Sequence, residues 1–178
     1  MTGRSGPARD WLLCTAWLVL IFLFMYYGRA LDPWFEGGRA FWAAALLGLA
    51  GLGLAAWLYA RWRRLPRPRR ARVGLGLLGC LAGLGLLAWW QPILIERTHL
   101  LLYGVLGIFT WRLAGRYASG ARRLLYAAAA CALVGLADEG AQHLHPQRVF
   151  DLRDAVTNAL SAWLLLAAIW LLRPPEPS

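Results

Sequence analysis

The sequence predicts an all-α protein, a polytopic membrane helix bundle with about six transmembrane helices. Of its 178 residues, 60% are hydrophobic and only 16% are charged. The apolar residues form long runs, and a run of about 17–25 residues can cross the ~30 Å hydrocarbon core of a bilayer as a helix. Little sequence remains outside these runs, so we expect a single transmembrane domain over 1–178. The expected spans are 11–27, 41–60, 73–90, 98–113, 124–143 and 154–172.

The first three spans are predicted from their apolar length. Span 11–27 follows a short polar leader without a small-x-small cleavage site, so we expect it to be retained as a helix. Spans 41–60 and 73–90 are rich in glycine and leucine, and Gly79 and Gly83 form a GxxxG pattern that lets helix backbones approach closely. The three cysteines are scattered singly through apolar segments, which favours packing over metal or redox chemistry.

The last three spans carry more polar residues. Span 98–113 has the apolar length of its predecessors, although the polar segment ERTH (96–99) stands at its start. Polar residues enter the ends of spans 124–143 and 154–172, so these two rest less on apolar length alone.

The arginines predict the orientation. All nineteen basic residues are arginine, and the net charge is +10. The segment RWRRLPRPRRAR (61–72) connects two apolar spans, so we interpret it as a cytoplasmic loop that contacts anionic lipid head groups, not as a nucleic-acid site. With the N-terminus inside, inner segments carry 14 arginines and outer segments carry 5. The positive-inside rule therefore predicts that both termini are cytoplasmic.

One stretch, LADEGAQHLHPQRVFDLRDAVTNAL (136–160), is far more polar than its surroundings. It holds four of the nine acids and two of the three histidines. Asp138 follows Leu124 by 14 residues, or about 21 Å of helix, which is less than the ~30 Å core. Asp138 and Glu139 should therefore lie within the outer half of the bilayer. Ionisable groups at that depth cost at least ~2.5–3.5 kcal/mol each unless paired or hydrated, so they mark a site or a polar cavity.

Three helices direct polar residues toward this stretch. Residues spaced by three, four or seven share one face of a helix. The start of the fourth helix has Glu96, His99 and Tyr103 at such spacings, and the start of the sixth has Asp151, Asp154 and Asn158. The fifth span pairs Asp138 with Gln142 and Glu139 with His143. The sequence therefore predicts one outer ligand-binding pocket shared by helices 4 to 6. Its candidate residues are Glu96, His99, Tyr103, Asp138, Glu139, Gln142, Arg148, Asp151, Asp154 and Asn158.

Unequal roles are expected for the two adjacent acids. Asp138 and Glu139 point about 100° apart on a helix. We expect Asp138 to join the hydrogen-bond network of the pocket and to pair with Arg148. We expect Glu139 to face a neighbouring helix and His99.

A structural role for the same residues stays open. Asp151 could be the N-cap of the sixth helix, with Asp154 completing a capping-box-like turn. Asp138 or Glu139 could pair with Arg148 or Arg153 to hold the outer loop. A metal site is not predicted, because the HxH at 143–145 lacks HExxH or a similar signature, and no cofactor is expected.

The chain resembles the VanZ-like membrane proteins. The matching segments are ERTHLLLYGVLG (96–107), DEGAQ (138–142) and PQRVFDLRDAVTNALS (146–161). The family positions are occupied by His99, Tyr103, Asp138, Glu139, Gln142, Pro146, Arg148, Asp154 and Asn158. Gln147 and Ser161 depart from the glycines usual at those positions. The resemblance covers roughly 96–172. It implies a multi-pass protein of the bacterial inner membrane that serves the cell envelope, in a family associated with teicoplanin resistance.

Three functions follow as hypotheses. In the first, the outer pocket binds a lipid-linked envelope component or another membrane lipid through its head group, with Arg148 gripping phosphate or carboxylate. In the second, paired carboxylates beside His99 perform acid-base chemistry on a lipid head group. In the third, the protein is a structural subunit or assembly factor among other membrane proteins. The first is preferred, because no nucleophile motif supports an enzyme.

Overall fold

A computed structural model describes residues 6–31, 33, 37–91, 93–143 and 151–174, without the side chains at 28–31 and 143. Every long element within these residues is a helix, and the six helices confirm the predicted all-α bundle. They are α1 (Pro7–Leu31), α2 (Gly37–Arg63), α3 (Arg67–Trp90), α4 (Leu94–Ala114), α5 (Gly120–His143) and α6 (Leu152–Leu172).

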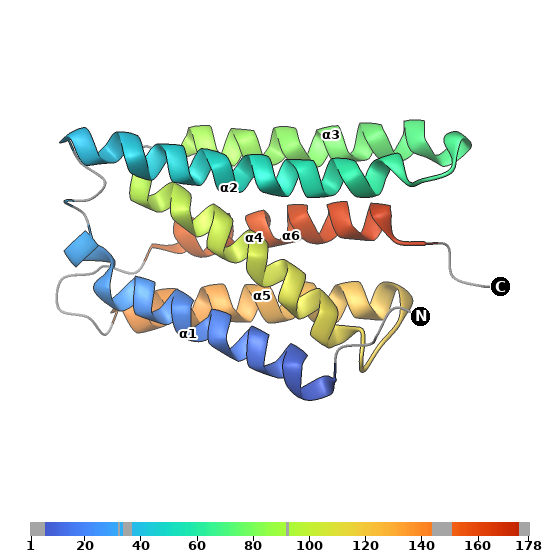
Figure 1. The fold of residues 1–178 in the computed structure, drawn as a ribbon. Coiled ribbons are helices and arrows are strands. Elements are labelled where there is room, and N and C mark those ends of the chain that lie inside the picture. The colour runs from blue at the N-terminus through green and yellow to red at the C-terminus, as the bar shows by residue number, and fades with distance from the viewer. Residues whose placement is uncertain (1–5, 32, 34–36, 92, 144–150, 175–178) are drawn as a thin grey trace.

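Helix α6 is the centre of the bundle. It packs against α3, α4 and α5, and α4 crosses it obliquely between α2 and α1 (Figure 1). In the apolar stretch of α6, 61% of the residues are buried, whereas in that of α2 only 6% are. The α4–α5–α6 unit is therefore the core, and α2 is a peripheral helix.

The surface of the bundle is apolar. Five helices, α1, α2, α3, α5 and α6, are long and apolar enough to cross a membrane. Large hydrophobic side chains point outward along them, such as Leu75 and Trp89. Soluble proteins rarely expose large contiguous apolar patches, so this surface suits lipid. The chain is a multi-pass membrane protein.

The polar content of α4 corrects one expectation. Span 98–113 was predicted from its apolar length. However, α4 is not among the five helices that are long and apolar enough to cross a membrane. Glu96, Arg97, His99 and Arg112 lower its mean hydropathy. Neighbouring helices cover it on several sides, which supplies the apolar surroundings that its own sequence lacks.

The helices extend beyond the predicted apolar spans. The largest difference is at 61–72, which the sequence predicted as a loop: α2 continues to Arg63 and α3 begins at Arg67. Pro66 is the N-cap of α3, and the second proline, Pro68, stands in the first turn. A proline there removes no hydrogen bond, because the first N–H groups of a helix have no partner within the helix. Most of this arginine-rich segment is consequently helical.

The two ends of the bundle differ in charge. The start of α1, the end of α6 and the turns at 64–66 and 115–119 lie at one end, here called the arginine end (Figure 1). Asp10 is the only acid of this end among the described residues, and it is buried. It accepts hydrogen bonds from Arg112 Nη2 at 2.8 Å and from Arg116 Nε at 2.9 Å. These contacts bind α1 to the end of α4 and leave this end strongly cationic.

We expect the arginine end to face the cytoplasm. In a chain without its native cysteines, Arg64→Cys should resist a membrane-impermeant thiol reagent added to intact cells and should react after permeabilisation. Gly38→Cys, at the opposite end and in open space, is the matched control and should react from outside. The reverse labelling pattern would show that the orientation is inverted.

Candidate functional site

The opposite end, here called the acidic end, holds the predicted site residues. The end of α5 and the starts of α4 and α6 meet there (Figure 1). At ~1.5 Å per residue, Tyr103 lies about 14 Å inside α4, Asn158 about 9 Å inside α6 and Asp138 about 8 Å from the end of α5. These residues are therefore well inside the bundle and form a buried polar cluster of Tyr103, Asp138, Glu139, Gln142 and Asn158.

A hydrogen bond between α4 and α5 lies at the centre of the polar cluster. The Tyr103 hydroxyl donates to Asp138 Oδ2 at 2.9 Å, and both side chains are completely buried. A completely buried bond between a phenol and a carboxyl group is strong because bulk solvent does not screen it. The sequence predicted that Tyr103 and Asp138 line the same pocket, and this hydrogen bond joins them directly. The sequence did not predict the bond itself.

Glu139 connects the end of α5 to the start of α6. Its Oε1 accepts from the Gln142 side-chain amide at 3.0 Å, and its Oε2 accepts from the backbone N–H of Asp151 at 3.2 Å. Gln142 therefore bonds to the residue three positions earlier, a partner that the i, i+4 spacing did not predict. Glu139 was expected to face a neighbouring helix, and that helix is α6. Its expected contact with His99 stays a prediction.

Asp151 is the N-cap of α6, as the structural alternative predicted. Its side chain accepts from the backbone N–H of Arg153 at 2.8 Å, which satisfies a helix N–H that has no partner in the first turn. In a capping box Asp154 would receive the N–H of Asp151, but Glu139 is the acceptor of that group. The first turn of α6 is thus fixed by an acid from α5.

Asn158 contributes an unsatisfied donor to the polar cluster. It is 2% exposed, and its amide nitrogen has no hydrogen-bond partner among the described residues. A Cβ atom placed on Gly135 would lie 3.7 Å from Asn158 Cβ and 3.8 Å from Tyr103 Cε1. These are ordinary contact distances, so Asn158 and Tyr103 both pack beside Gly135 of α5. One turn further, the Ser161 hydroxyl donates to the backbone carbonyl of Asn158 at 2.9 Å.

The remaining described candidates lie nearer the end of the bundle. Glu96 is half-buried, and its charge interacts with those of Asp154 and Arg153. His99 is also half-buried, and its ring meets that of Phe24 on α1 edge-on, with centroids 5.7 Å apart. The three-residue face predicted for α4 thus divides into a buried Tyr103 and two residues closer to the surface.

Arg148 lies outside the described residues, as do His145 and Pro146 and the side chain of His143. The expected pairing of Asp138 with Arg148 therefore stays a prediction. Within the part of the chain that the structure describes, no group of three histidine, cysteine or acidic residues could hold a metal ion.

The sequence did not single out Asp10. The available signal was a single acid just before the first apolar span and two arginines, Arg112 and Arg116, spaced four residues apart at the end of the fourth. Asp10 lies at the arginine end and takes no part in the polar cluster.

No family model, no curated protein and no solved structure matches this chain. The likeness to the VanZ-like proteins consequently rests on the motif residues alone and stays a prediction.

Proposed function

We propose that the protein binds the polar head group of a lipid-linked envelope component through the polar cluster at the acidic end. Five polar side chains, two of them acids, are buried together there. Ionisable groups are rare inside membrane proteins, and by default they mark a ligand site or a pathway. The prediction that the arginine end is cytoplasmic assigns this cluster to the outer leaflet of the inner membrane.

The observation that carries the proposal is the amide nitrogen of Asn158. A buried donor without a partner costs about 1–3 kcal/mol, and proteins seldom retain one without a reason. An oxygen of a phosphate or carbonyl group would satisfy it. The Tyr103 hydroxyl is already bonded to Asp138, and the Gln142 side chain to Glu139. These side chains would therefore line the site without changing their conformation.

The motif likeness supports the same conclusion. Asn158, Tyr103, Asp138, Glu139 and Gln142 all occupy VanZ-like positions. That family implies a bacterial inner-membrane protein of the envelope associated with glycopeptide resistance, and Arg148 would supply the cation that grips phosphate.

A structural role is the second candidate, favoured by the bonds between Tyr103 and Asp138 and between Glu139 and Asp151. They join α4 to α5 and α5 to the start of α6. In that role the polar cluster would hold a subunit or assembly factor together and bind nothing.

Asn158→Leu separates the two candidates, because it removes the unsatisfied donor and keeps a similar volume. We expect it to leave thermal stability unchanged or higher and to weaken binding of a polyprenyl phosphate by about fivefold, the loss of roughly one hydrogen bond of ~1 kcal/mol. Purified protein in detergent would be titrated with polyprenyl phosphate.

Ser161→Ala, one turn away on the same face, is the matched control and should bind like the wild type. A lower melting temperature for Asn158→Leu with unchanged binding of polyprenyl phosphate would remove the binding proposal and favour the structural role.

A further inference from the structure

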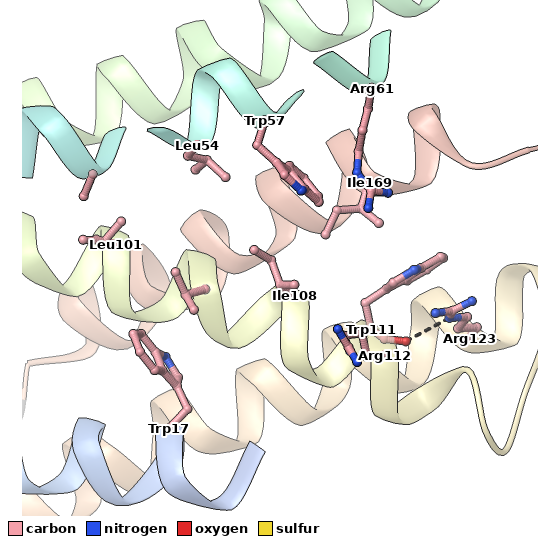
Figure 2. Close-up of a pocket in the computed structure, with 12 residues that line it drawn as sticks. Trp17, Leu54, Trp57, Arg61, Leu101, Ile108, Trp111, Arg112, Arg123 and Ile169 are labelled. Atoms are coloured by element: carbon pink, nitrogen blue, oxygen red, sulfur yellow. Dashed lines mark hydrogen bonds between the residues drawn. The ribbon is translucent and has the colours of Figure 1, made fainter. Parts of the chain in front are cut away.

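A second cavity lies away from the polar cluster. It has a volume of about 720 Å³, within the ~300–1,000 Å³ of typical small-molecule sites. Its walls come mainly from α2 and α4, with Trp17 of α1, Arg123 of α5 and Ile169 of α6 completing them. Figure 2 shows Leu54, Leu101 and Trp17 toward one end and three arginines toward the other. The proposed head-group site does not include any of these residues.

The cavity is apolar over most of its length. Leu101, Val105 and Ile108 share one face of α4, and Ala50 and Leu54 face them from α2. Leu101 and Arg112 are 11 residues apart, which corresponds to about 16 Å of helix. Half of a ~30 Å hydrocarbon core is about the same length, so the cavity spans one leaflet.

The arginines make one end of the cavity cationic. Arg61 lies over the Trp57 ring, 4.2 Å from its centroid, and Arg123 lies over the Trp111 ring at 4.0 Å. Within the described residues neither of these two arginines forms an ion pair with an acid. Arg112 also lines the cavity but shares Asp10 with Arg116. Positive charge therefore exceeds negative charge at this end.

The stacked arginines are ready to bind an anion. The Arg123 Nε donates to the Trp111 carbonyl at 2.9 Å, which fixes the guanidinium beside the cavity. Stacking on an indole holds a guanidinium flat while its N–H edges stay available, and those edges match the oxygens of a phosphate. Arg61 and Arg123 come from different helices and line the same end of the cavity (Figure 2).

We propose that this cavity binds an anionic phospholipid of the leaflet at the arginine end. Its phosphate contacts Arg61 and Arg123, and one acyl chain lies along Leu54, Leu101 and Ile108. An apolar channel as long as one leaflet, with arginines at the head-group level, complements both parts of such a lipid. Among the described residues α1 and α2 have no extended contact with each other, so an acyl chain has a lateral way in.

Charge is tested first. Purified full-length protein in a neutral detergent is titrated with phosphatidylglycerol that carries a fluorophore on its acyl chain. We expect Arg61→Gln to weaken binding about fivefold, or ~1 kcal/mol, the contribution of one arginine near an anionic lipid. Arg64→Gln, three residues along and outside the cavity, is the matched control and should bind within twofold of the wild type. Equal loss in both variants would reduce the effect to general surface charge and overturn the proposal.

The channel is tested second. Ala50 lines the cavity, so Ala50→Trp should fill the acyl-chain path and weaken binding at least fivefold. Leu49→Trp adds an indole at a neighbouring position that is 65% exposed toward lipid, and it should leave binding unchanged. Circular dichroism of each variant shows whether the fold is kept. Unchanged binding by a folded Ala50→Trp protein would overturn the proposal.

Competition identifies the source of the phosphate. Unlabelled phosphatidylglycerol should displace the probe, whereas inorganic phosphate and phosphatidylethanolamine at the same concentration should not. Displacement by inorganic phosphate would indicate a site for free anions, and equal displacement by phosphatidylethanolamine would remove the role of charge; either result contradicts the proposal. Asn158→Leu should leave this binding intact, so failure here is distinguishable from failure of the head-group site at the acidic end.

Discussion

Gly107→Ala is expected to lower the free energy of unfolding by about 1–3 kcal/mol, the usual cost of overpacking a close contact. A Cβ atom on Gly107 would lie only 3.1 Å from the backbone carbonyl oxygen of Ala162 on α6 and 3.4 Å from Leu166 Cγ. Backbone gives way less readily than a side chain, so α4 and α6 would have to separate. Unfolding in a denaturing detergent, followed by circular dichroism, measures the effect.

Gly104→Ala is the matched control on the same helix. Its Cβ would meet only Leu165 Cδ2 at 3.7 Å, an ordinary contact. Since alanine favours helix over glycine by up to ~1 kcal/mol, this variant should be as stable as the wild type or more stable. Equal destabilisation by the two substitutions would mean that the close approach at Gly107 has no special importance.

Tyr103→Phe is expected to destabilise the protein by about 1.5 kcal/mol. Polar pairs between membrane helices contribute ~0.6 kcal/mol on average and ~1.7 kcal/mol at most. The bond from Tyr103 to Asp138 is completely buried and has a carboxyl acceptor, so we expect a value in the upper part of that range.

A double-mutant cycle isolates this bond. Asp138→Asn is combined with Tyr103→Phe, and the coupling between the two substitutions should exceed ~0.5 kcal/mol, the limit of additivity for independent sites. Strictly additive losses would show that the two residues stabilise the bundle separately.

Much of the fold followed from the sequence because membrane helices have a simple signature. An apolar run of sufficient length must hydrogen-bond its own backbone in lipid, and a helix is the local way to do so. The ends were less predictable. Arginines do not stop a helix, so α2 and α3 continue through most of 61–72, where the change of polarity had indicated a loop.

The sequence predicted which residues gather in the polar cluster, but not which of them form hydrogen bonds with each other. Helical periodicity brought Tyr103, Asp138 and Asn158 to one region, as the structure has them. It did not indicate that Gln142 bonds to Glu139, since positions three and four residues apart are both within reach. The cavity left no sequence signal at all: its apolar residues are ordinary for a membrane helix, and Arg61 and Arg123 are indistinguishable from other arginines of the positive-inside pattern.

The peripheral place of α2 has a consequence for how fast the large cavity opens and closes. A segment with few buried contacts separates from its neighbours at a much lower free energy than the whole protein unfolds. Because so little of α2 is buried, it can swing away while α4, α5 and α6 stay packed. Fluctuations of this one helix would then set the rate at which the large cavity exchanges its contents with the bilayer, and the polar cluster at the other end would remain undisturbed throughout.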